Sequence, residues 1–140
     1  MRAELSGLEE ESFALSWNKK KQGRLCSASG TSICVWDVEK SSTPSVELRN
    51  AHVENINDVK FSPLQEDLMV STSDDGHFKI WDLRTKKFSL AYKAADDSLC
   101  AGQFNPLNEH LFAVAGDSSG NVGVWDLRMP ACALNELIFH

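Results

Sequence analysis

Hydrophobic and polar residues alternate along this chain in short stretches. In Phe78-Lys79-Ile80-Trp81, for example, Phe78 and Ile80 fall on one face of an extended strand, and Lys79 and Trp81 fall on the other. The stretches are rich in Val, Ile, Phe, Ser and Thr, and they lack the three-to-four-residue spacing of amphipathic helices. This pattern predicts an all-β chain.

Polar turn segments interrupt the stretches and divide the chain into twelve expected strands. In the turn at 74–76, Gly76 can supply the positive φ of a tight turn, and Asp75 can bond to its own backbone. The strands form three groups of four. The sequence predicts them at residues 12–17, 24–28, 32–37 and 45–49, then 56–61, 68–73, 78–83 and 88–93, then 98–104, 110–115, 121–127 and 133–139.

Two sequence markers recur with nearly the same period. Trp-Asp pairs begin at Trp36, Trp81 and Trp125, which are 45 and 44 residues apart. An apolar run that ends in an aromatic residue before a polar turn closes at residues 17, 61 and 104, at intervals of 44 and 43. Because both markers hold one period, the chain contains three repeats, which we place at about residues 7–50, 51–94 and 95–140.

A repeat of this length, with four strands and a Trp-Asp pair closing the third, resembles the WD repeat, the unit of β-propellers. The resemblance covers essentially the whole chain. It implies a WD-repeat β-propeller segment of three four-stranded antiparallel blades, part of a seven-bladed ring. In the second repeat it also implies a buried hydrogen-bonded tetrad of His52, Ser71, Asp75 and Trp81.

The other two repeats depart from the tetrad pattern. In the first, Leu8 replaces the histidine and the turn at 29–31 is one residue short. In the third, the resemblance places Ala95, Ala115 and Ser119 where the histidine, serine and aspartate would stand. We therefore expect the complete tetrad in one blade only, so Trp36 and Trp125 need other partners.

Three blades leave sheet faces that a closed ring would cover. The sequence begins at the start of one repeat and ends where the next would open. We therefore expect a segment of a larger propeller, completed by further blades or by association with another chain.

A narrower resemblance is carried by residues 7–18, 25–29, 33–37 and 104–128. These segments resemble the retinoblastoma-binding histone chaperone family, whose members serve in chromatin assembly factor and as the accessory subunit of type B histone acetyltransferase. The resemblance implies a nuclear protein, also present in the cytoplasm. Its implied partners are core histones or other basic peptides and the subunits of chromatin-modifying complexes.

That family holds a basic peptide with acidic and aromatic residues on one propeller face. The corresponding positions of this chain are Glu11, Phe13, Asn55, Asn57 and Cys100. Glu11 and Phe13 match the acidic and aromatic types, whereas Asn57 replaces an acid and Cys100 replaces a polar amide. Two alternatives stay open, because residues 9–11 can be a solvated acidic run and Phe13 can be a core residue.

A second functional class rests on residues 69–84, which resemble the box by which WD-repeat substrate receptors dock on a cullin-type ubiquitin ligase adaptor. Arg84 and Arg128, each two residues after a Trp-Asp aspartate, would be the exposed contacts. The structural alternative is that each arginine pairs with a carboxylate of a neighbouring blade.

Composition excludes several other classes. The 140 residues carry 14 basic and 20 acidic side chains, a net charge of −6, which argues against direct nucleic-acid binding. No apolar run approaches the roughly 20 residues of a membrane span. Cys26, Cys34, Cys100 and Cys132 lack metal-ligand spacing, so we expect no cofactor and take the cysteines as core residues in a reducing compartment. The sequence carries no catalytic constellation, so we expect a non-enzymatic protein.

Overall fold

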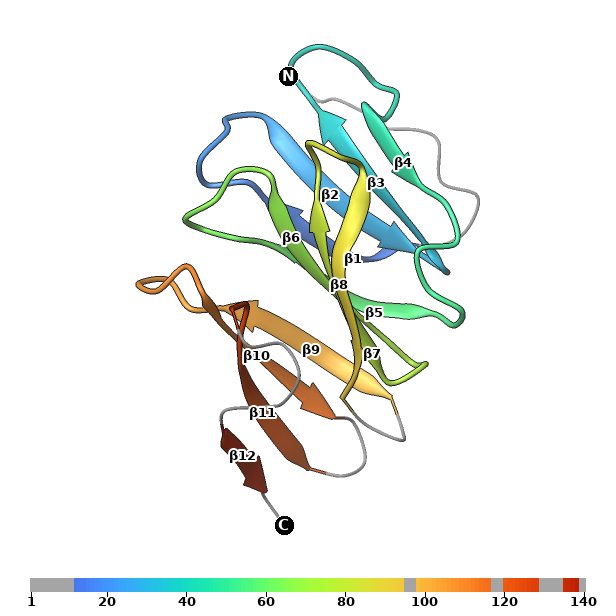
Figure 1. Cartoon of the computed structure of the whole chain (residues 1–140). Coiled ribbons are helices and arrows are strands. Elements are labelled where there is room, and N and C mark those ends of the chain that lie inside the picture. The colour runs from blue at the N-terminus through green and yellow to red at the C-terminus, as the bar shows by residue number, and fades with distance from the viewer. Residues whose placement is uncertain (1–11, 95–97, 117–119, 129–134, 139–140) are drawn as a thin grey trace.

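The computed structural model describes residues 12–94, 98–116, 120–128 and 135–138, and all regular structure in these ranges is strand. The strands form three antiparallel sheets that follow one another along the chain (Figure 1). Each sheet has four strands, and neighbours in sequence are neighbours in space.

The first blade contains β1 (Ser12–Trp17), β2 (Arg24–Ser29), β3 (Ser32–Asp37) and β4 (Val46–Leu48). The second contains β5 (Ile56–Phe61), β6 (Leu68–Ser73), β7 (His77–Asp82) and β8 (Lys87–Lys93). The third contains β9 (Leu99–Phe104), β10 (Leu111–Gly116), β11 (Asn121–Asp126) and β12 (Asn135–Ile138). Each expected strand is present with its ends within two residues of the prediction, which confirms the fold class.

Glycines with positive φ close the hairpins that the sequence predicted. Gly30 (φ 55°) lies between β2 and β3, and Gly76 (φ 78°) lies between β6 and β7. A side chain at either position would be strained in this left-handed conformation, which explains why glycine stands there.

Apolar side chains fill the space between successive blades. One buried cluster joins the first and second blades and includes Val35, Phe61 and Trp81. Another joins the second and third blades and includes Phe78 and Phe104. The alternation in β7 therefore works as predicted, because Phe78 and Trp81 face opposite neighbours.

Hydrogen bonds between blades fix their relative position. The backbone N–H of Phe61 donates to Oγ of Ser16 at 3.0 Å, and the N–H of Gly102 donates to the Asp58 carboxylate at 3.1 Å. Gly102 lies so close to the second blade that a Cβ added there would stand 3.0 Å from Cγ2 of Thr72. The blades are thus packed face to face rather than tethered by linkers.

The outer face of β1 is apolar and open. Trp17 is 60% exposed, as is Leu15 on the same face. Strand register makes Trp17 equivalent to Phe61 and Phe104, which are both buried. The same position therefore packs against a preceding blade in the second and third repeats.

The described part of the chain contains no helix that could cross a membrane and no group of three or more His, Cys, Asp or Glu residues placed to hold a metal ion. Cys26 and Cys34 are buried, as expected for core cysteines. Cys100 is exposed, so the expectation that it belongs to the core was wrong.

Candidate functional site

The second blade joins four polar side chains in one chain of hydrogen bonds. His52 Nδ1 lies 3.2 Å from Oδ2 of Asp75, and its Nε2 lies 2.7 Å from Oγ of Ser71. Nε1 of Trp81 donates to the same Ser71 hydroxyl at 2.9 Å. The structure thus brings together all four residues that the WD-repeat resemblance implied.

A neutral His52 satisfies every member of this chain. Its Nδ1–H donates to Asp75, while its Nε2 accepts the hydroxyl proton of Ser71, whose oxygen accepts from the indole. A protonated imidazole would instead compete with that hydroxyl donor. Burial lowers the pKa of His52 to about 4, outweighing the opposing attraction of Asp75.

Asp75 is held as a carboxylate. Burial acts to raise its pKa, but hydrogen bonds from the backbone N–H of His77, from His52 and from the backbone N–H of Val53 prevail. The pKa of Asp75 therefore lies below its usual 3.8. These hydrogen bonds satisfy the polar side chains of the tetrad and stabilise the blade.

The first blade retains half of this arrangement. Nε1 of Trp36 donates to Oγ of Ser27 at 3.0 Å, so Trp36 finds the serine partner without the full tetrad. Leu8, which replaces the histidine, lies outside the described residues.

Strand register corrects the expected position of the missing serine in the third blade. Ser71 pairs with the residue two positions before its tryptophan. In the third blade that residue is Gly123, and it pairs with Val114 rather than with Ala115. Val114 cannot accept a hydrogen bond, and Nε1 of Trp125 is buried without a partner among the described residues.

Polar residues gather where β5 and β9 begin. The amide nitrogen of Asn57 donates to the Asp74 carboxylate at 2.7 Å and to the backbone oxygen of Leu99, in the next blade, at 2.8 Å. The N–H of Asp74 in turn donates to the backbone oxygen of Asn55 at 2.9 Å, and Asn55 is exposed. Asn57 therefore orients Asp74 and links two blades, while Asn55 and Asp74 reach the surface.

Cys100 lies at the same end of the third blade. It is exposed, and its Sγ lies 3.5 Å from the backbone oxygen of Ala115 at the end of β10. Glu11 and the side chain of Phe13 lie outside the described residues. Asp74 could not be predicted as a site residue, because no motif distinguishes it from an ordinary turn aspartate and only the Asn57 contact shows that it is oriented.

Arg84 and Arg128 have nearly the same geometry in successive blades. Nη2 of Arg84 donates to Asp82 at 2.8 Å, and Nη2 of Arg128 donates to Asp126 at 2.7 Å. Both arginines are more than half exposed. Each pairs with its own blade, so the expected pairing with a neighbouring blade's carboxylate was wrong. The hydrogen bonds of Arg128 lower the pKa of Asp126 to about 2.

Comparison with known proteins agrees with this architecture. Residues 43–82 match the family described as WD domain, G-beta repeat. Together with the three four-stranded sheets, this match shows a WD-repeat propeller fold in the described part of the chain.

Among WD-repeat proteins, the chain is similar to the WD-40 repeat-containing protein MSI3 of Arabidopsis thaliana. The two are 34% identical over 138 residues, which cover 95% of this chain and 32% of MSI3. The chain therefore spans about a third of the length of this curated relative.

Proposed function

We propose that this chain is part of a non-enzymatic, histone-binding WD-repeat scaffold of nuclear complexes that assemble or modify chromatin. Basic histone tails would bind on the propeller face where β5 and β9 begin. The similarity to MSI3 supports a scaffold role, and the resemblance of residues 7–18, 25–29, 33–37 and 104–128 to the histone chaperone family supports a histone ligand.

The oriented carboxylate of Asp74 is the observation that carries this proposal. The Asn57 amide donates to Oδ1 of Asp74, and a backbone hydrogen bond to Asn55 fixes the turn. The Asp74 side chain is therefore already ordered before a ligand arrives. Its second carboxylate oxygen can accept a hydrogen bond from the ligand with little further loss of side-chain entropy. A lysine or arginine of a histone tail would gain a charge-assisted hydrogen bond there. The exposed Asn55 and Cys100 would line its path, with Glu11 and Phe13 as the further contacts that the sequence predicts.

Substitution of Asp74 tests the proposal. Asp74→Asn removes the negative charge but keeps an oxygen for Asn57, so we expect the blade to fold and the affinity for a core-histone tail peptide to fall about fivefold to tenfold. Fluorescence anisotropy of a labelled tail peptide on the full-length protein measures this change. Affinity should also fall as salt is raised.

Glu109→Gln is the matched control. Glu109 is exposed in the β9–β10 turn, at the opposite end of the third blade, and its substitution removes one negative charge. Equal affinities for wild type and Asp74→Asn, or equal losses in both variants, would contradict binding at the β5 and β9 face.

A further inference from the structure

A cleft of about 420 Å³ lies between the first and second blades. It is separate from the face that contains Asp74, and none of the residues predicted for histone binding lines it. Its volume falls in the range of ligand-binding pockets. The lining residues are Glu47, Leu48, Arg49, Asn50, Ala51, Lys79, Trp81, Lys86 and Lys87.

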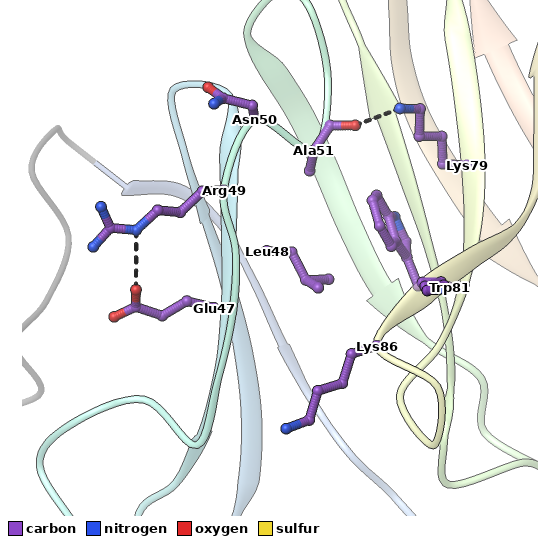
Figure 2. Close-up of a pocket in the computed structure, with 9 residues that line it drawn as sticks. Glu47, Leu48, Arg49, Asn50, Ala51, Lys79, Trp81 and Lys86 are labelled. Atoms are coloured by element: carbon purple, nitrogen blue, oxygen red, sulfur yellow. Dashed lines mark hydrogen bonds and ion pairs between the residues drawn. The ribbon is translucent and has the colours of Figure 1, made fainter.

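The floor of the cleft is apolar. Leu48 and Trp81 approach each other from the two blades, and Ala51 lies above them (Figure 2). All three belong to the buried cluster that joins the blades. Each of the three is less than 10% exposed, so the apolar floor has little surface left to bury and the basic wall must supply most of the recognition.

Lysines of the second blade make one wall basic. Nζ of Lys79 donates to the backbone oxygen of Ala51 at 2.6 Å and lies 5.7 Å from the centre of the Trp81 ring. Lys86 also lines the cleft, and its side chain extends away from Trp81 (Figure 2). Within the described part of the chain, neither Lys86 nor Lys87 forms an ion pair. This wall therefore carries positive charge that is not neutralised, although the net charge of the whole chain is −6.

The opposite wall does not neutralise these lysines. Its carboxylate, Glu47, is bound by Arg49 at 3.1 Å, and both side chains lie on the side of β4 away from Trp81 (Figure 2). β4 itself pairs only with β3 among the described strands. An edge strand can offer backbone hydrogen bonds to an extended peptide.

The two rims share an unusual backbone conformation. Asn50 (φ 52°) and Lys86 (φ 58°) are the non-glycine residues with positive φ in the described ranges, and both line this cleft. For lysine this conformation is uncommon, and here it belongs to a residue that lines the cleft.

From these observations we propose that the cleft binds an extended acidic peptide of a partner protein. Acidic side chains of the peptide would contact Lys86 and Lys87, and a neighbouring apolar side chain would pack on Leu48 and Trp81. A peptide fits better than a nucleic acid, because the basic wall is short and the chain as a whole would repel a long polyanion. This site goes beyond the histone-binding proposal, since its ligand has the opposite charge.

The test uses a short fluorescein-labelled peptide of alternating Glu and Leu residues, titrated with the full-length protein. Reversing both charges in Lys86→Glu/Lys87→Glu should weaken binding at least about tenfold. The matched control, Lys19→Glu/Lys20→Glu, makes the same charge change at exposed positions in the β1–β2 turn and should leave affinity within about twofold. A peptide with Gln in place of Glu should bind at least about tenfold more weakly than the acidic one.

Three results would overturn the proposal. Equal weakening in both lysine variants would show that only overall charge matters. Equal binding of the Gln and Glu peptides would show an apolar contact without charge recognition. Tighter binding of a single-stranded oligonucleotide, lost on Lys86→Glu/Lys87→Glu, would assign the cleft to nucleic acid. Asp74→Asn should not weaken binding of the acidic peptide, so this site and the histone site can fail independently.

Discussion

His52 shows how one buried side chain couples this fold to pH. Its imidazole satisfies both of its hydrogen-bond partners only when it is neutral. The oxygen of Ser71 accepts the indole N–H of Trp81, so the hydroxyl of Ser71 donates its own proton to Nε2 of His52, which must be unprotonated to accept it. Burial of the ring also favours the neutral form and lowers the pKa of His52 to about 4, from the ordinary value of 6.5. At this scale, the hydrogen bonds of His52 tie three other polar side chains of the second blade together.

Stability should fall as the solution is acidified below about pH 6.5. Between the ordinary and the folded pKa, the unfolded chain binds a proton on His52 that the folded chain does not. The stability that comes from the lowered pKa of Asp75 is lost only at more acidic pH, since that pKa lies below 3.8. Urea unfolding at about pH 7 and about pH 5 should show a loss of about 2 kcal/mol that is absent in His52→Gln. An equal loss in both proteins would mean that His52 does not supply the pH dependence.

At the scale of elements, the β10–β11 hairpin is longer than its counterparts: its strands are separated by four residues, against three in the second blade and two in the first. Its register pairs Val114 with Gly123, so the position of the tetrad serine is apolar and Trp125 Nε1 has no partner among the described residues. A cavity of about 30 Å³ lies beside this indole. Among the described residues, the third blade therefore lacks the indole acceptor that Ser71 supplies in the second blade, and an unpaired buried N–H is costly.

Val114→Thr should supply this acceptor. The new hydroxyl can accept from Trp125, and this gain of about 1 kcal/mol should offset much of the cost of burying a hydroxyl. Val70→Thr is the matched control, since Val70 is equally buried and faces the same cluster. Urea unfolding should show Val114→Thr as the less destabilised variant by about 1 kcal/mol, and equal destabilisation would contradict the assigned register.

The hairpin also shows what the sequence could and could not predict. The alternation of apolar and polar residues and the turn residues predicted the position of every strand. The resemblance to the WD repeat predicted the four tetrad residues of the second blade. The shift from Ala115 to Val114 was missed because a hairpin one residue longer changes the pairing without changing the apolar pattern. Asp74 was missed for a related reason, because its orientation depends on Asn57, which lies on another strand.

At the scale of the whole molecule, the two surfaces that we propose as binding sites, for ligands of opposite charge, lie on one segment. The end where β5 and β9 begin presents Asp74, while the cleft between the first two blades presents Lys86 and Lys87. The open face of Leu15 and Trp17 matches positions that are buried between blades elsewhere in the chain. We expect another blade to cover this face, leaving both binding surfaces accessible at the rim and at the end of the ring.

Protection of Cys100 from alkylation tests the central proposal most directly. Cys100 is exposed on the proposed histone face, whereas burial raises the pKa of Cys26 to about 12 and that of Cys34 to about 11, so both should react slowly. In a Cys132→Ser protein, the rate of iodoacetamide modification of Cys100 can be followed by mass spectrometry. A histone-tail peptide at ten times its Kd should slow this rate about tenfold. An unchanged rate with the peptide fully bound would show that histone tails bind elsewhere.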